Sequence, residues 1–172
     1  MAYKTIKCNL TFASITNLIS KLNTLSNELE KSANNIVDDL LDIGKDEVLS
    51  QYNGDTFKEE IATYTVKKER SGNKGKVVAS GNQILYDEYG TGFQGSLRPH
   101  PDKSKISGLK AYESGPKINK VTHKWVYLDS NKKPIVTTGR PAGMYMFYGF
   151  QKIQEKKLSI SKKRVGEAIS KI

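Results

Sequence analysis

The sequence predicts an α+β fold, and two kinds of periodicity carry that prediction. From Phe12 to Gln51 apolar residues recur every three or four positions, which is the spacing of one face of a long helix. Two later stretches alternate apolar and polar residues around Gly- and Asn-containing turns, which indicates hairpins. We therefore expect one domain, residues 1–172, with a long N-terminal helix and a C-terminal helix packed on a small antiparallel sheet of about four strands, together with a long basic loop.

The N-terminal helix is expected over residues 12–52. Ser14 or Thr11 can cap its start, and the segment Tyr52–Asp55, which contains Gly54, is a typical helix end. We favour packing of this helix on the sheet. A coiled coil over Ile15–Leu29 stays open as an alternative, although the repeat changes phase after Leu25. The apolar face comprises Ile15, Leu18, Leu22, Leu25, Leu29, Ala33, Ile36, Leu40 and Ile43.

Residues 60–92 are expected to form a hairpin, with its turn in Ser71–Gly75, followed by a short helix. Residues 121–138 should form a second hairpin that turns at Asp129–Pro134. Its first strand would place Val121, His123, Trp125 and Tyr127 on one face. The C-terminal helix, residues 141–172, should begin within the aromatic-rich segment Met144–Ile153.

Composition places the chain among water-soluble proteins from a reducing compartment. Its 172 residues are enough to bury a core without disulfides or metal, and the single cysteine, Cys8, has no partner for an intrachain disulfide. The first residues lack the apolar stretch of a secretory signal, and no run reaches the ~18 apolar residues of a membrane span. We expect no membrane association.

The net charge of +10 is unevenly distributed along the chain. Thr11–Ser50 holds three lysines against seven acidic residues, whereas Gln151–Ile172 holds seven basic residues against two acidic ones. Opposite charge can draw the C-terminal segment of one subunit to the N-terminal helix of another, or join the two within one chain. Two independent solvated faces are the third interpretation, because exposed ion pairs contribute little.

A long segment with few features of packed structure spans residues 93–120. It contains three glycines and three prolines, and six basic residues against Asp102 and Glu113. Loops of this length are uncommon in compact domains unless they are functional or mobile. We expect a mobile loop that becomes ordered against a neighbouring protein, the alternative being a variable insertion without a role.

Groups of residues suited to catalysis are not evident. The two histidines, His100 and His123, and the distant Cys8 do not have the spacing of metal ligands. The acidic residues Asp38, Asp39, Asp42 and Asp46 lie on a single predicted helix, whereas two-metal chemistry needs carboxylates that converge from several elements. We expect a protein that is not an enzyme and that uses no metal or cofactor.

The segment Val77–Gly92 reads as a strand, a turn, a short helix and a glycine stop. Gly81, Gly90 and Gly92 suit left-handed backbone positions or close approaches. The Gly90-Thr91-Gly92 triplet could also be read as part of a phosphate-binding loop. It follows a helical segment instead of a strand and lacks a Gly-Lys-Ser/Thr ending, so a helix C-cap is the better interpretation.

This pattern resembles the tail-completion, or head-tail joining, protein family of long-tailed bacteriophages. The resemblance covers most of the chain in its order of elements. It departs from the family after Pro141-Ala142, where the apolar-aromatic run to Phe147 is kept but a second proline is missing. The residues that carry the signature are Ala79, Gly81, Tyr86, Glu88, Tyr89, Gly90, Thr91 and Gly92.

The resemblance implies a structural virion protein of the neck or tail of a siphovirus, made in the cytoplasm of the bacterial host. It would assemble as a homo-oligomeric ring, expected to be a hexamer, and dock on tail-tube, tail-terminator or head-completion proteins. The interface residues that we expect are Tyr86, Glu88, Tyr89, Gly90, Thr91, Gly92, Arg98, Lys103, Lys105, Lys110, Lys156, Lys157, Lys162 and Lys163.

A basic nucleic-acid-binding module is the alternative function. It rests on the +10 charge and on lysine-rich segments near Tyr112, Trp125, Tyr127 and Tyr145. The two functions overlap, since lysines that line a ring could contact DNA in its channel. They differ in their dependence on conditions: a docking ring forms without DNA, whereas DNA binding weakens steeply with salt as counterions are released.

Overall fold

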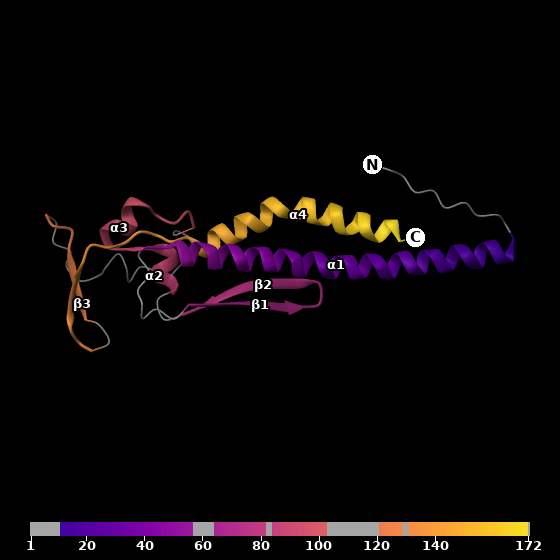
Figure 1. Cartoon of the computed structure of the whole chain (residues 1–172). Helices are drawn as coiled ribbons and strands as arrows, with labels where there is room; N and C mark the ends of the chain where they lie inside the picture. Colours follow the sequence, from indigo (N-terminus) through magenta and orange to yellow (C-terminus); the bar gives the residue numbers. More distant parts are fainter. Residues whose placement is uncertain (1–10, 57–63, 82–83, 103–120, 129–130, 172) are drawn as a thin grey trace. The chain divides into compact units, whose positions relative to one another are not determined.

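The α+β class and the two terminal helices are confirmed by a computed structural model, which describes residues 11–56, 64–81, 84–102, 121–128 and 131–171 (Figure 1). The helices are α1 (Phe12–Gly54), α2 (Ile84–Tyr89), α3 (Gly92–Leu97) and α4 (Tyr145–Ser170). The strands are β1 (Thr65–Ser71), β2 (Lys74–Ser80), β3 (Trp125–Leu128), β4 (Pro134–Thr137) and β5 (Gly139–Arg140).

The described residues form two separate two-stranded sheets, whereas one sheet of about four strands was expected. β1 pairs with β2 across a two-residue turn, in which Gly72 has the positive φ of +58° that such tight turns require. β3 and β4 are antiparallel, with Trp125 opposite Thr137 and Leu128 opposite Pro134. The two predicted hairpins are therefore both present.

Contacts along the chain divide it into two compact units. The first comprises Met1–Gly44, Lys68–Val77 and Gln151–Ile172, and the second comprises Lys45–Lys67 and Val78–Phe150. Both α1 and α4 contribute residues to each unit. The assignment of residues 1–172 to a single domain stays a prediction.

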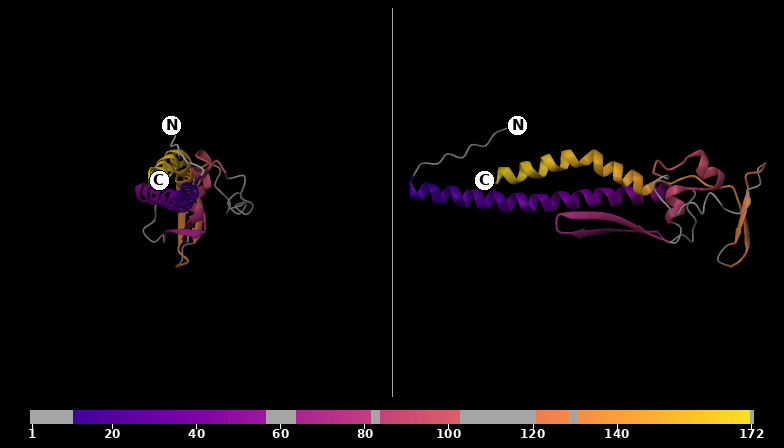
Figure 2. Two further views of the ribbon diagram at one scale, coloured as in Figure 1. Left: turned by 90° about the vertical axis from the view of Figure 1, so that its right-hand side faces the viewer. Right: turned by 180° about the vertical axis from the view of Figure 1, so that it is seen from behind.

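In the first unit α4 runs antiparallel to α1, as Figures 1 and 2 show. Arg164 donates from Nε and Nη2 to the two carboxylate oxygens of Asp39 at 2.7 and 2.9 Å, and Ser32 Oγ donates to the carbonyl of Arg164 at 2.9 Å. Lys171 pairs with Glu28 at 2.6 Å. The opposite charges of the two terminal segments thus join them within one chain, which was one of the interpretations that the sequence left open.

The β1–β2 hairpin contacts α1 in the same unit, as predicted for a helix packed on strands. Arg70 pairs with Asp38 and donates to Asn34, and Lys68 pairs with Asp42. A side chain at Gly75 would lie 2.5 Å from Leu41 Cδ1, so the strand approaches the helix closely. Three neighbouring carboxylates of α1, including that of Asp39, each have a basic partner, which offsets their mutual repulsion.

The ends of α1 lie close to their predicted positions. Thr11 Oγ1 accepts the N–H of Ser14 at 3.3 Å, which satisfies one of the free donors of the first turn. The helix ends at Gly54, two residues beyond the predicted end. α4 begins at Tyr145, within the aromatic-rich segment expected at its start but four residues after residue 141, because the positive φ of Met144 (+57°) does not allow a helical path through that residue.

Two other predictions need correction. Residues 93–97 form α3, so the predicted loop over 93–120 is wrong for this part, while residues 103–120 lie outside the described residues. Val121 and His123 precede β3 instead of lying in it, because His123 has a φ of +55°, which a strand does not allow. The His123 ring stacks on Phe93 with centroids 4.0 Å apart.

Candidate functional site

The signature at the end of α2 interlocks with the segment before α4, both in the second unit. Gly90 ends α2 with a φ of +70°, and its N–H donates to the carbonyl of Tyr86 at 2.9 Å. A Cβ at Gly90 would lie 2.6 Å from the backbone nitrogen of Ala142 and 2.9 Å from the carbonyl oxygen of Arg140. Glycine is thus required here both for the left-handed conformation, as predicted, and for the close approach.

Backbone pairing extends this contact along both segments. Thr91 pairs with Arg140 and Gly92 with Gly139 in antiparallel bridges, and Thr91 Oγ1 accepts the N–H of Arg140 at 3.2 Å. On the other side of Gly90 the N–H of Gly143 donates to the carbonyl of Asp87 at 2.7 Å. The two segments are therefore held by main-chain bonds on both sides of Gly90.

Glu88 caps the N-terminus of α4. Its Oε2 accepts the N–H of Met146 at 2.9 Å, and its Oε1 accepts the N–H of Phe147 at 3.0 Å. Both amides belong to the first turn of α4, where backbone donors have no partner within the helix and where a negative charge is favoured by the helix dipole. A carboxylate from α2 thereby supplies the cap that the sequence around Tyr145 lacks.

His100 completes the surroundings of this carboxylate. Its Nδ1 accepts the N–H of Asp102 at 3.0 Å, which in a neutral ring leaves the proton on Nε2, 3.2 Å from Glu88 Oε1. Both His100 and Glu88 are 5 % exposed. The ring packs at 4.4 Å from that of Tyr89 and edge-on to that of Phe147 at 5.4 Å, so it is held from both sides.

Arg140 lies at the centre of a polar group in which Asp87 and Tyr145 are buried and Asp55 and Arg140 are half-buried. We call this group the Arg140 cluster: Asp55, Asp87, Arg140 and Tyr145. Arg140 Nη1 pairs with Asp87, and Nη2 lies 3.0 Å from Asp55 Oδ2 and 3.3 Å from the Tyr145 hydroxyl. The Tyr145 hydroxyl donates to Asp55. Because Asp87 is only 2 % exposed, its charge depends on this guanidinium for compensation.

Two further tyrosines, Tyr52 and Tyr64, pack against Tyr145 of the cluster. The rings of Tyr52 and Tyr64 stack at 4.1 Å, and Tyr145 meets both edge-on at 5.7 Å. Burial and the Asp55 carboxylate raise the pKa of Tyr145 above its ordinary value, and burial and the nearby Glu88 raise that of Tyr64. Both hydroxyls therefore stay protonated at neutral pH, and Tyr145 remains a donor to Asp55.

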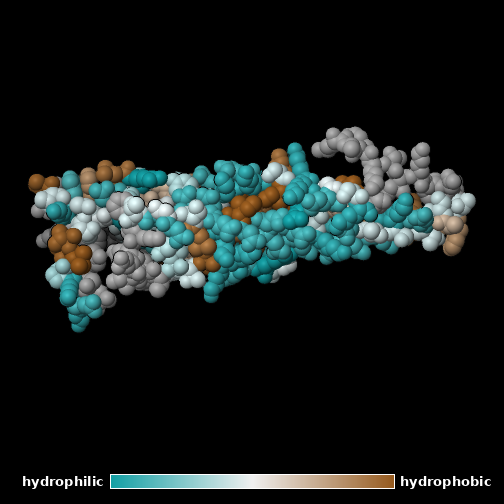
Figure 3. All heavy atoms as spheres, in the orientation of Figure 1, coloured by the Kyte–Doolittle hydropathy of each residue, from teal (hydrophilic) through white to brown (hydrophobic). Residues whose placement is uncertain are grey.

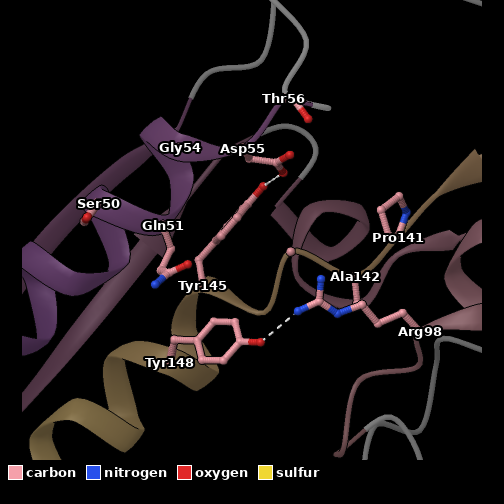
Figure 4. A pocket seen from close by; sticks show the side chains of 11 residues that line it. Ser50, Gln51, Gly54, Asp55, Thr56, Arg98, Pro141, Ala142, Tyr145 and Tyr148 are labelled. Carbon is pink, nitrogen blue, oxygen red and sulfur yellow. Dashed lines mark hydrogen bonds between the residues drawn. The ribbon is translucent and has the colours of Figure 1, made fainter.

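An open pocket of about 450 Å³ adjoins Tyr145 (Figure 4). Figure 4 shows Tyr145 reaching toward Asp55, and Tyr148 toward Arg98, whose Nη2 donates to its hydroxyl at 3.0 Å. The walls combine the end of α1 with the segment before α4. The lining residues are Ser50, Gln51, Gly54, Asp55, Thr56, Arg98, Pro141, Ala142, Gly143, Tyr145 and Tyr148.

The chemistry of this region is that of a structural junction. The carboxylates of Asp55, Asp87 and Glu88 are all engaged by donors from the same chain. Among the residues that the structure describes, no group of three or more His, Cys, Asp or Glu side chains is placed to hold a metal ion. The arrangement is suited to fixing the start of α4 against α2.

The predicted interface residues fall into several environments. Glu88, Gly90 and Thr91 are buried within the chain, Tyr89 and Gly92 are half-buried, and Tyr86 is 41 % exposed. Arg98 is exposed beside the pocket. In the first unit the α4 lysines at 156, 157, 162 and 163 are all exposed. Lys103, Lys105 and Lys110 lie outside the described residues, and a role of these positions in an interface stays a prediction.

Several residues of the junction were not singled out by the sequence. Asp87 is 53 residues from Arg140 in the chain, and Asp55 is 85 residues from Arg140 and 90 from Tyr145, so only the fold brings these side chains together. One local signal was available for Asp87 and Glu88: two adjacent acidic residues stand in a short apolar helix that ends at a glycine. Adjacent helix positions point in different directions, which is how these two carboxylates reach different partners.

Comparison with protein-family models, with curated proteins and with solved structures finds no match. Within the described part of the chain, no helix combines the length and the apolar character needed to cross a bilayer.

Proposed function

We propose that this protein is a structural virion component of the head-tail junction or tail end of a long-tailed bacteriophage, acting through ring assembly and docking. The observation that carries the proposal is the contact between the two motifs on which the resemblance rests. Gly90 of the signature lies against Ala142 of the Pro-Ala segment, and Glu88 caps the helix that follows. Two motifs that lie apart in the sequence thus serve one structural purpose.

This arrangement supports a docking role because the contacts that fix the backbone leave other side chains of α2 exposed at the surface. Leu85 and Tyr86 of α2 are 50 % and 41 % exposed although the next two residues are buried. A rigid element that presents an apolar and an aromatic side chain is a common form of protein-protein contact. In a closed ring this face would meet a different face of the next subunit.

A basic nucleic-acid-binding module is the second candidate. The observation in its favour is the set of exposed lysines on α4, at positions 156, 157, 162 and 163. Phosphate contacts need only exposed cationic side chains, and they would give an affinity that falls steeply as salt rises.

The two candidates are separated by locating the protein and by measuring its affinity for DNA. An epitope-tagged copy, expressed during infection by the phage that encodes it, should be detected in purified virions by mass spectrometry and by labelling at the junction of head and tail. Absence from virions, together with salt-sensitive binding of duplex DNA by the purified chain, would favour the second candidate. The variant in which all four α4 lysines are replaced by glutamine shows whether that binding uses them.

A further inference from the structure

The N-terminal part of α1 carries an uncovered apolar face. Phe12 is 88 % exposed and Ile19 is 54 % exposed, values unusual for large apolar side chains that share one side of a helix. Figure 3 shows hydrophobic side chains reaching the surface among hydrophilic ones along the helical part of the chain. We call this face the α1 stripe: Phe12, Ile15, Ile19, Leu22 and Leu29.

The spacing of the stripe is that of a coiled coil. With Ile19 included, the steps between successive positions alternate between three and four without a change of phase, through Ser26 and on to Ile43. The repeat changes phase after Leu25 only when Leu18 and Leu25 are taken as its positions in place of Ile19 and Ser26. A sustained seven-residue repeat is the pattern of a helix that packs along another helix of the same period, since it keeps the seam facing the partner.

The other elements of the first unit lie on different sides of α1. The ion pair nearest the C-terminus joins Lys171, just beyond the end of α4, to Glu28, so residues 12–27 precede the described contacts with this segment. Further along, α4 contacts Ser32 and Asp39, and the hairpin contacts Asn34, Asp38 and Leu41, none of which belongs to the repeat. The described residues of the unit therefore leave the stripe open.

We propose that the α1 stripe binds the same stripe on a second copy of this chain. Identical stripes match each other in period and in position of their large and small side chains, including the small residue Ser26 within the seam. Covering the five exposed side chains on two copies removes on the order of 1,000 Å² from water, the lower end of what specific interfaces bury. An isolated helical segment of this length is only marginally stable in water, so association also stabilises it.

The polar side of the same turns argues against a membrane surface as the partner. Between Phe12 and Leu29 it carries one lysine, Lys21, and otherwise neutral residues and Glu28. Helices that lie on anionic membranes usually have several basic residues on that side. A second helix does not need this charge.

The inference goes beyond the proposed ring, because a stripe that meets the same stripe pairs two copies, whereas a closed ring uses contacts between different faces. It rests on the proposed function only for its biological setting. Self-association through the stripe is measurable with the purified full chain alone. The experiment is sedimentation equilibrium over a wide range of protein concentration, with helicity followed by circular dichroism. The test variant is Ile19→Glu with Leu22→Glu, and the matched control is Asn17→Glu with Thr24→Glu, which adds the same charge to exposed positions on another side of the same turns.

The wild-type chain and the control should associate reversibly, and their helicity should rise with concentration. The test variant should associate at least about 100-fold more weakly, because a buried carboxylate would face its copy in the seam. A wild-type chain that stays monomeric at every concentration, or a test variant that associates like the wild type, would overturn the inference. Stripe-dependent binding to neutral phospholipid vesicles by a monomeric chain would overturn it in favour of a lipid surface.

The outcomes also distinguish this inference from the proposed function. If the chain is found at the head-tail junction but the test variant assembles normally, only the inference fails. If association depends on the stripe but the chain is missing from virions, only the proposed function fails.

Discussion

Glu88 accepts the backbone N–H of Phe147 at 3.0 Å, so a side chain of α2 caps a helix that begins 56 residues beyond the end of α2 in Tyr89. The helix start at Tyr145 follows a proline, two small residues and a methionine with positive φ, which provide no side-chain oxygen for the first turn. The position of α4 therefore depends on the signature. The signature therefore contributes first of all to the stability of the fold.

Removing the Glu88 carboxylate should destabilise the fold. Glu88→Ala leaves two buried amides of α4 and the His100 ring without their acceptor, and we expect a loss of about 2–4 kcal/mol in the free energy of unfolding. Urea denaturation measures it. The control Glu155→Ala, at an exposed position of α4, should change stability by less than about 0.5 kcal/mol. Equal losses in the two variants would contradict the capping role.

The Asp87–Arg140 pair should show strong coupling. Arg140→Met leaves the buried carboxylate of Asp87 uncompensated, and we expect it to cost about 3–5 kcal/mol. In the double variant, Asp87→Asn with Arg140→Met, the loss should be smaller than the sum of the two single losses, because the uncompensated charge is gone. A double-mutant cycle from denaturation curves measures this coupling, and additive losses would show that the two side chains are independent.

Gly90 and Gly166 should respond in opposite directions to an added side chain. Gly90→Val places a Cβ 2.6 Å from the Ala142 nitrogen at a φ of +70°. We expect it to lower the free energy of unfolding by more than about 1 kcal/mol. Gly166 lies in α4 with no atom within 4 Å of an added Cβ, so Gly166→Ala should stabilise by about 0.5–1 kcal/mol. Melting temperatures of both variants test this, and an unchanged value for Gly90→Val would rule out the described turn.

Acid should weaken the contact between α1 and α4. Hydrogen bonds from Arg164 lower the pKa of Asp39, so the pair contributes stability that is complete above the unfolded-state pKa, near 4, and lost as pH falls through the lower folded-state value. Asp39→Asn should therefore flatten the decline of stability with pH below about 4. In an Arg164→Gln background the same substitution should leave the decline unchanged. Parallel declines in the original background would contradict the assignment.

Local features of the fold could be predicted because their causes are local. The periodic apolar residues and a threonine cap specify α1. Glycine at position 90 favours a left-handed backbone conformation, which ends a helix through local sterics alone. Whether the hairpins form one sheet or two could not be predicted in the same way, since the pairing of hairpins depends on contacts between distant segments. α3 was missed because Gly92–Leu97 contains two glycines, which weaken a helical signal.

The junction itself could not be read from the chain. Asp55, Asp87 and Arg140 are not spaced in the sequence in a way that predicts contact. They meet because Gly90 lets the segment after α2 approach the segment before α4. The capping role of Glu88 was hidden for the same reason, as its partners lie far along the sequence. Burial of Glu88, Gly90 and Thr91 directs attention to exposed neighbours such as Leu85 and Tyr86 as the surface for docking.

The proposed head-tail role is tested most directly by deleting the coding gene from the genome of the phage to which the proposal assigns it and imaging the particles by electron microscopy. The proposal predicts filled heads and separate tails, with infectivity restored by the wild-type chain supplied from a plasmid. Infectious virions with heads joined to tails in the absence of the chain would contradict it.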